Sequence, residues 1–293
     1  MLEGTTVTSR EKTIELCWTP ALGRLIDLAL EEDLGHGDVT TEAVGSLGGG
    51  VGRIYCREPI VACGLPVADW VVERAEPALK WDAKVEDGTV LPASSELGCL
   101  TGPAAAILRV ERTVLNFLMR TCGVATLTRR YTEAVEGTGA RVVDTRKTVP
   151  GWRLLDKHAV KVGGGANHRA HLGSGILLKD NHIAACGSVW QAVARARAAA
   201  PHTLRVEVEV EDESEVAEAL EAGADVILLD NMKPSQVAAV VQQVAGRAVI
   251  EVSGGVTLTT VRAYAKAGAG IISVGALTHS APAVNLSLDL EIR

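Results

Sequence analysis

Chemistry-bearing residues recur in the second half of the chain at the ends of short β-branched runs. Cations come first along the sequence, carboxylates follow, and a Ser-Gly-Gly turn and a Val-Gly turn come last. In chain order these residues are Arg146, Lys147, Lys179, Glu209, Asp230, Ser253, Gly254, Gly255 and Gly275. Cationic side chains bind carboxylates and phosphates, and glycine turns let backbone N–H groups approach a phosphate closely. The pattern predicts a pocket that holds two anionic reactants.

The loop Gly-Gly-Gly-Ala-Asn-His-Arg at 163–169 adds two further candidates, His168 and Arg169. A guanidinium group binds a carboxylate bidentately, so Arg169 suits an acidic substrate. A lone histidine is more often a core or capping residue, but the adjacent Arg169 favours a functional role for His168. Glu209 and Asp230 would repel phosphate, so we expect them to accept hydrogen bonds from sugar hydroxyls or to hold magnesium through water. Taken singly, each of these charges could be an ordinary solvated loop residue.

These residues need a scaffold in which strand ends meet. Short β-branched runs alternate with Ala-rich helical stretches at a repeat of roughly 20 to 25 residues, which is typical of βα units and a parallel sheet. The runs span 141–145, 176–180, 204–210, 225–230, 248–253 and 270–274, and the later helices span 214–222, 234–245 and 259–267. No Gly-x-Gly-x-x-Gly motif opens a helix after the first run. A barrel, with its chemistry at the carboxyl ends of the strands, is therefore favoured over a nucleotide-binding open sheet.

The first half of the chain has a mixed layout. A helix is expected over 20–32 and another over 67–74, and extended runs are expected over 51–57, 79–85 and 97–100. The pattern changes between Gly123 and Gly139. We predict an N-terminal α+β domain followed by the barrel.

Composition narrows the function classes. A net charge of -7 and 3% aromatic residues argue against nucleic-acid binding, and 47% hydrophobic residues suit a large buried core. The six cysteines lack metal-ligand spacing and are expected to be buried free thiols. Met1 to Arg10 is polar, without the apolar stretch of a secretory leader, and no run of about 18 apolar residues predicts a membrane helix. We expect a cytoplasmic protein.

Eight motifs in order give the chain a strong resemblance to the quinolinate phosphoribosyltransferase family, also called carboxylating nicotinate-nucleotide pyrophosphorylases. The resemblance extends from about Glu31 to Leu288. The motifs are Glu111-Arg-Thr-Val-Leu-Asn116, Thr145-Arg-Lys-Thr-Val-Pro-Gly151, Gly163-Gly-Gly-Ala-Asn-His-Arg169, Leu178-Lys-Asp-Asn-His182, Val206-Glu-Val-Glu209, Leu228-Leu-Asp-Asn231, Ser253-Gly-Gly255 and Val274-Gly-Ala-Leu-Thr278.

The resemblance implies an open, incomplete parallel α/β barrel over 124–278 and an N-terminal α/β sandwich domain over 1–123, which the segment at about 279–293 rejoins. It implies conversion of quinolinate and 5-phosphoribosyl 1-pyrophosphate to nicotinate mononucleotide, pyrophosphate and CO2, with Mg2+ as cofactor. It also implies a homodimer in which Arg112 is donated to the partner's quinolinate site. Assembly of dimers into a hexamer stays open.

The resemblance assigns roles within the pocket. The two carboxylates of quinolinate would contact Arg146, His168, Arg169 and Lys179, and Lys147 would lie between them and the donor. Glu209 and Asp230 would hold the ribose hydroxyls and magnesium, and the 5-phosphate would contact Ser253, Gly254, Gly255 and Gly275. Lys147, Lys179, Glu209 and Asp230 are the expected catalytic residues.

Two alternatives stay open at this point. One is a related phosphoribosyltransferase-like protein of the molybdenum-transport-associated group, and the other is a non-catalytic barrel that senses a phosphate ligand. The segment Asp33 to Thr40 has no derivable role beyond a structural loop, and His279 has none either.

Overall fold

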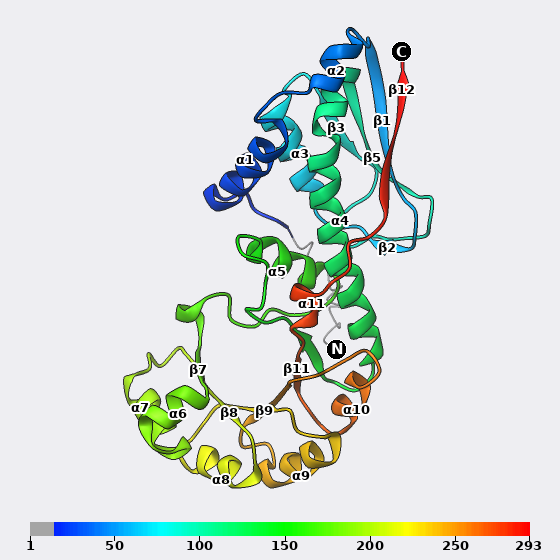
Figure 1. The fold of residues 1–293 in the computed structure, drawn as a ribbon. Coiled ribbons are helices and arrows are strands. Elements are labelled where there is room, and N and C mark those ends of the chain that lie inside the picture. Colours follow the sequence, from blue (N-terminus) through cyan, green and yellow to red (C-terminus); the bar gives the residue numbers. More distant parts are fainter. Residues whose placement is uncertain (1–14) are drawn as a thin grey trace, which may run out of the picture.

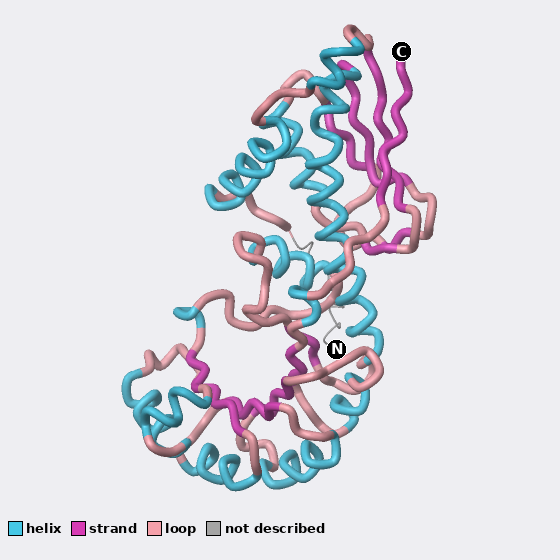
Figure 2. Tube along the Cα trace, viewed as in Figure 1, coloured by secondary structure: helices cyan, strands magenta, loops and turns pink. Residues whose placement is uncertain are grey.

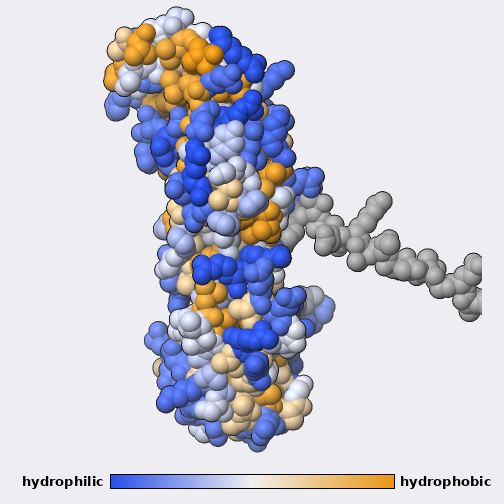
Figure 3. Space-filling model, turned by 90° about the vertical axis from the view of Figure 1, so that its right-hand side faces the viewer, coloured by the Kyte–Doolittle hydropathy of each residue, from blue (hydrophilic) through white to orange (hydrophobic). Residues whose placement is uncertain are grey.

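The computed structural model describes residues 15–293, and the predicted absence of a leader at Met1 to Arg10 lies outside them. The molecule is elongated, with a sandwich domain at one end and a barrel at the other (Figures 1 and 3). Figure 3 also shows hydrophobic surface at the sandwich end and in smaller areas along this face. Over the described range, no helix has the length and apolarity needed to cross a bilayer.

Six parallel strands form the barrel, in the order β6-β11-β10-β9-β8-β7. They curve through an arc whose two edges, β6 and β7, do not pair with each other (Figure 2). The strands are β6 (Arg141–Val143), β7 (Ile176–Leu178), β8 (Val206–Val210), β9 (Val226–Asp230), β10 (Val249–Ser253) and β11 (Ile271–Ser273). The prediction of an open parallel α/β barrel beside a sandwich domain is confirmed.

Helices cover the outside of the arc. They are α6 (Asp180–Cys186), α7 (Val189–Ala199), α8 (Glu213–Glu221), α9 (Pro234–Val244) and α10 (Val261–Lys266). The short helix α11 (Ala276–His279) instead lies at the junction with the sandwich domain, near α4 and α5 (Figure 1). Ser188 and Asp212 cap the starts of α7 and α8, and Pro234 occupies the first turn of α9, where a missing N–H costs nothing. Each of these three helices buries valines against the sheet, which fixes its orientation.

The sandwich domain is built on an antiparallel sheet in the order β12-β1-β5-β3. Its strands are β1 (Gly49–Cys56), β3 (Lys80–Ala83), β5 (Glu96–Pro103) and the C-terminal β12 (Leu286–Ile292), and a separate pair joins β2 (Ile60–Val61) to β4 (Val90–Leu91). Helices α1 (Pro20–Leu34), α2 (Val39–Val44) and α3 (Leu65–Ala75) complete the domain. Asp38 caps α2, which gives the turn at 33–40 a structural explanation.

Helix α4 (Ala104–Ala134) runs the length of the junction between the domains and passes through the predicted boundary at Gly123 without a break (Figure 1). Its buried stripe includes Ile107, Val110, Val114 and Leu118, as the helical spacing predicts. A Cβ at Gly123 would overlap the backbone carbonyl of Pro282, so only glycine lets the C-terminal segment cross the helix here.

Helix α5 (Arg153–Val162) fastens the barrel to α4. Trp152, at its N-cap, stacks on Phe117 with ring centroids 4.9 Å apart. Asp156 accepts hydrogen bonds from the Arg120 guanidinium group, which also donates to the carbonyl of Thr278. Through Arg120, α4 thus contacts both α5 and α11.

All six cysteines are free thiols, as predicted. The expectation that all are buried is wrong for Cys17, which is exposed, and for Cys186, which is half-buried. Cys17 lies in the segment before α1, where no second layer covers it.

Candidate functional site

A pocket of about 630 Å³ opens at the carboxyl edge of the barrel strands, a size typical of ligand sites. Every predicted site residue except Arg112 contributes to its lining. Those residues are Arg146, Lys147, His168, Arg169, Lys179, Glu209, Asp230, Ser253, Gly254, Gly255 and Gly275. The structure therefore brings together side chains that are more than 100 residues apart in sequence.

The barrel strands present these side chains in two levels. Residues two apart in a strand point to the same side of the sheet, so each strand can place two side chains inside the barrel. The pairs that line the pocket are Leu177 and Lys179, Leu228 and Asp230, Glu251 and Ser253, and Ser273 and Gly275. The residue nearer the strand end reaches the mouth and the earlier one forms the floor.

Arg146 and Arg169 lie close enough for the charge of Arg146 to affect the pKa of Arg169. Burial lowers the pKa of the Arg169 guanidinium, and the positive charge of Arg146 lowers it further. Neither guanidinium forms an ion pair with any carboxylate in residues 15–293. The Nε of Arg146 is buried and has no hydrogen-bond partner there. Two such neighbouring cations are stabilised by an anionic ligand.

The carboxylates at the mouth are engaged by neighbouring side chains. The ammonium group of Lys179 pairs with Glu209, which ends the next strand. Asp230 accepts a 2.7 Å hydrogen bond from the amide of Asn231. Glu209 and Asp230 are oxygen donors of the kind that hard cations prefer, and they end neighbouring strands β8 and β9. Since Lys179 already occupies one oxygen of Glu209, contact with a metal through water fits better than direct ligation.

The turn after β10 has a backbone that requires glycine. Gly254 has a φ of +86°, and a Cβ there would overlap the side chain of Asn231. Gly255 follows with a φ of +58°. At the end of the next strand, a Cβ on Gly275 would lie 3.1 Å from the ring of His279 and 3.2 Å from the Cδ of Lys147. Both turns thus expose backbone to the pocket, which suits a phosphate group.

Sequence reasoning missed several residues beneath the pocket. Glu251 lines the pocket and Glu207 lies beside it, in contact with His168, and they are only 2% and 8% exposed. Asp144 and Lys157 form a buried ion pair under the loop that carries His168. The sequence contained a signal for the two glutamates. Acids at inward positions of the strand segments Val206–Val210 and Val249–Ser253 are unusual, because a barrel is normally filled by branched apolar side chains.

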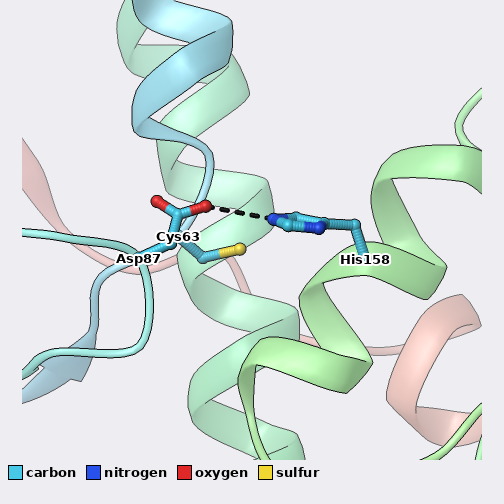
Figure 4. A group of neighbouring side chains, drawn as sticks. All are labelled: Cys63, Asp87 and His158. Carbon is cyan, nitrogen blue, oxygen red and sulfur yellow. Dashed lines mark hydrogen bonds and ion pairs between the residues drawn. The ribbon is translucent and has the colours of Figure 1, made fainter. Parts of the chain in front are cut away.

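Within residues 15–293, two groups of side chains have ligand atoms close enough to hold a metal ion. The first joins Cys63, Asp87 and His158, and Figure 4 shows the imidazole of His158 pointing from α5 toward the other two. Asp87 already caps α3 by accepting the N–H groups of Gly64 and Leu65, both at 3.0 Å, and lies 3.0 Å from Nε2 of His158. Burial raises the pKa of the Cys63 thiol, which opposes metal binding. This group is a contact between α5 and the sandwich domain.

The second group joins His168 and Glu251, which line the pocket, to Glu207 beside them. Nε2 of His168 lies 3.2 Å from Glu207 and 3.5 Å from Glu251. The hydrogen bond to Glu207 raises the pKa of His168. Burial first, and then the charge of Glu207, raises the pKa of Glu251 to about 7.

Arg112 lies outside the pocket of its own chain. It is exposed on α4, within the sandwich domain. Its predicted role in a partner's site stays a prediction.

Two family descriptions match the chain: quinolinate phosphoribosyl transferase, N-terminal domain, over residues 38–122, and the C-terminal domain over 124–289. The nicotinate-nucleotide pyrophosphorylase [carboxylating] of Mycobacterium leprae is 42% identical, and the match covers 94% of this chain and 99% of that one. The human protein of the same name is 37% identical, with 92% and 91% covered. A NadC crystal structure from Streptococcus pyogenes aligns with a TM-score of 0.89 and 38% identity over 95% of this chain and all of that one.

The raised pKa of Glu251 predicts a pH-dependent stability. The folded state holds the Glu251 proton more tightly than the unfolded state, whose carboxyl titrates near 4.5, so this stabilisation is present below about pH 4.5 and is lost as pH rises through about 7. The variant Glu251→Gln cannot titrate at this position. We expect the free energy of unfolding of wild type, relative to the variant, to fall by up to about 3 kcal/mol across this window. Urea denaturation of both proteins at about pH 5 and pH 8 measures this, and an unchanged difference would contradict it.

Proposed function

The chain belongs to the quinolinate phosphoribosyltransferase family, and we propose from its pocket how individual residues carry out the family's reaction. It is a pentosyltransferase that joins quinolinate to 5-phosphoribosyl 1-pyrophosphate and yields nicotinate mononucleotide, pyrophosphate and CO2, a step in NAD biosynthesis. The names of the relatives reported above describe this activity. They support neither the molybdenum-associated group nor a non-catalytic barrel as the function of this chain.

The cationic side of the pocket is proposed to bind the two carboxylates of quinolinate. The observation that carries this assignment is the pair Arg146 and Arg169, two neighbouring guanidinium groups without a carboxylate partner in the described chain. Lys179 and Lys147 line the same pocket, and Lys147 lies next to the turn at Gly275. The resemblance also places His168 among the carboxylate ligands, although both of its ring nitrogens contact protein groups.

The opposite side is proposed to bind the phosphoribosyl donor. Ser253, Gly254, Gly255 and Gly275 would surround its 5-phosphate with backbone N–H groups. Glu209 and Asp230 would accept hydrogen bonds from the ribose hydroxyls and hold the water shell of Mg2+. When bound, the metal neutralises charge on the pyrophosphate leaving group.

These contacts let the protein work by position and charge. The pyridine nitrogen attacks C1 of the ribose as the bond to pyrophosphate breaks. The carboxylate next to that nitrogen then leaves as CO2, the electron pair of the broken bond stays on the ring carbon, and that carbon takes a proton from solvent. Lys179 and Lys147 hold the two polyanions together and offset their repulsion. The substrates are small molecules, and no role of nucleic acid or of a membrane is proposed.

Arg112 is proposed to act in trans within a homodimer. It lies at an exposed position of α4, in the sandwich domain and away from the barrel mouth, so a second subunit is needed to bring it to a pocket. We propose the dimer as the catalytic unit.

The reaction and its metal are tested together. Purified protein that has been treated with a chelator and desalted is mixed with quinolinate and the donor. Release of pyrophosphate and CO2 in a 1:1 ratio is expected only after Mg2+ is added, because the leaving group carries charge that the pocket must offset. Full turnover in metal-free buffer would refute the magnesium proposal, and no turnover with Mg2+ would refute the assigned reaction.

Removal of one cation at the quinolinate end should abolish binding without unfolding the protein. For Arg146→Ala and for Lys179→Ala we expect the dissociation constant for quinolinate to rise at least about a hundredfold, since the ligand carboxylate loses a charge-assisted partner. Calorimetric titration gives the constant, and thermal melting reports on the fold. Arg195→Ala, at an exposed position of α7, is the matched control. Unchanged affinity in either pocket variant would remove that residue from the site.

Mixed dimers test the shared site. Neither Arg112→Ala nor Lys179→Ala alone should be active. Co-expression with two different tags lets mixed dimers be isolated, and one of their two pockets then has both wild-type residues, so isolated mixed dimers should recover about half of wild-type activity. An unfractionated random mixture, in which about half of the dimers are mixed, should recover about a quarter. A mixture no more active than its two parents would refute donation of Arg112 across the interface.

A further inference from the structure

Two buried acids at the base of the site are used by no step above: Glu251 lines the pocket, and Glu207 lies beside it against His168. Glu207 and Glu251 lie two residues before Glu209 and Ser253 in strands β8 and β10 and point to the same side of the sheet. Both are buried, beneath a mouth that must attract a dianion. Buried acids are costly unless they are paired and hydrogen-bonded. Their position therefore calls for a specific partner.

That partner is His168. Its Nε2 lies 3.2 Å from Oε2 of Glu207 and 3.5 Å from Oε1 of Glu251, and that Oε1 has no hydrogen-bond partner within the described chain. The backbone N–H of Arg169 donates to Nδ1 of the same ring at 2.7 Å. A ring that accepts at Nδ1 carries its proton on Nε2, so the Nε2–H group points at the glutamates. In this arrangement neither ring nitrogen is free for a substrate carboxylate.

The backbone of the same loop is fixed independently. The N–H of His168 donates to Asp144 at 2.9 Å, and its carbonyl accepts from the Lys157 ammonium at 3.0 Å. Asp144 follows β6 and Lys157 belongs to α5, whereas the glutamates belong to β8 and β10. Four elements thus hold one loop, and the next residue in that loop is Arg169. Its guanidinium donates to the carbonyl of Gly175 at 3.2 Å and lines the pocket.

We propose that Glu207 and Glu251 are positioning residues that act through His168 to hold Arg169 at the quinolinate end of the pocket. His168 then connects the two glutamates to Arg169, and it does not itself bind a carboxylate of quinolinate. This inference rests on the proposed assignment of Arg169 to quinolinate. Partners of this kind, one shell removed from a ligand, typically change affinity by about 10–100-fold when removed.

The first test removes the acceptors. Glu207→Met and Glu251→Met keep the side-chain length and lose the carboxylate, whereas the corresponding Gln variants keep an oxygen that can accept from Nε2–H. We expect the Met variants to raise the dissociation constant and KM for quinolinate about tenfold or more. The KM for the donor should stay within about twofold, and the Gln variants should restore most of the affinity. The control Glu221→Gln lies at an exposed position of α8.

Two outcomes of the first test overturn the proposal. One is quinolinate affinity within twofold of wild type in both Met variants. The other is an equal rise in both KM values, which would indicate a general distortion of the pocket. Stoichiometric divalent metal in the purified protein that is lost in Glu251→Gln would also overturn it, because the three side chains would then be ligands.

A second test does not depend on the folding of the Met variants. His168→Phe keeps a ring and removes both nitrogens. If His168 acts through Arg169, the double variant with Arg169→Ala should bind quinolinate no more weakly than Arg169→Ala alone. Additive losses would mean that His168 binds the substrate directly and would refute the proposal. Unchanged affinity in Arg169→Ala by itself would instead refute the assignment of Arg169 to quinolinate, so the two failures can be told apart.

Discussion

Unpaired positive charge at the mouth of the barrel is the constraint on which the rest of the structure depends. The chain is acidic overall, with a net charge of -7, yet Arg146 and Arg169 face the same pocket without a carboxylate partner in residues 15–293. Such an arrangement attracts anions strongly because the surrounding barrel wall excludes water. It also needs a rigid scaffold, since the two guanidinium groups repel each other when no ligand is bound.

Contacts made by helix α5 and by strand β12 supply that rigidity. Helix α5 contacts the loop that carries His168 through Lys157, Arg120 of α4 through Asp156, and the sandwich domain through His158. Arg120 in turn donates to the carbonyl of Thr278 in the last helix of the barrel. Strand β12 then returns the chain to the sandwich sheet beside β1. A displacement of either domain would therefore move the loop that carries Arg169. The barrel thus presents the reactive groups, and the sandwich domain with α4 and α5 holds them in place.

Much of the fold could be predicted from the sequence. The six barrel strands and the helices α8, α9 and α10 follow from periodicity and from glycine at the helix ends, because those signals are local. Helices α5, α6 and α7 were not predicted. Polar residues such as Asp156, Lys157 and His158 interrupt the apolar pattern of α5, and they are buried because α4, the barrel and the sandwich domain cover them. Strand β12 was expected only as a returning segment, since its pairing partner lies more than 200 residues earlier.

The sequence by itself determined which residues reach the mouth, since strand ends and glycine turns are written locally and parallel strands bring their carboxyl ends to one edge. It also determined the family, through motifs that span nearly the whole chain. Only the tertiary structure decided what those residues contact. Glu207 and Glu251 meet His168 because three separate segments converge at the barrel floor, and Lys179 pairs with Glu209 because β7 and β8 are neighbours. Such contacts depend on distances between segments, which no local pattern encodes.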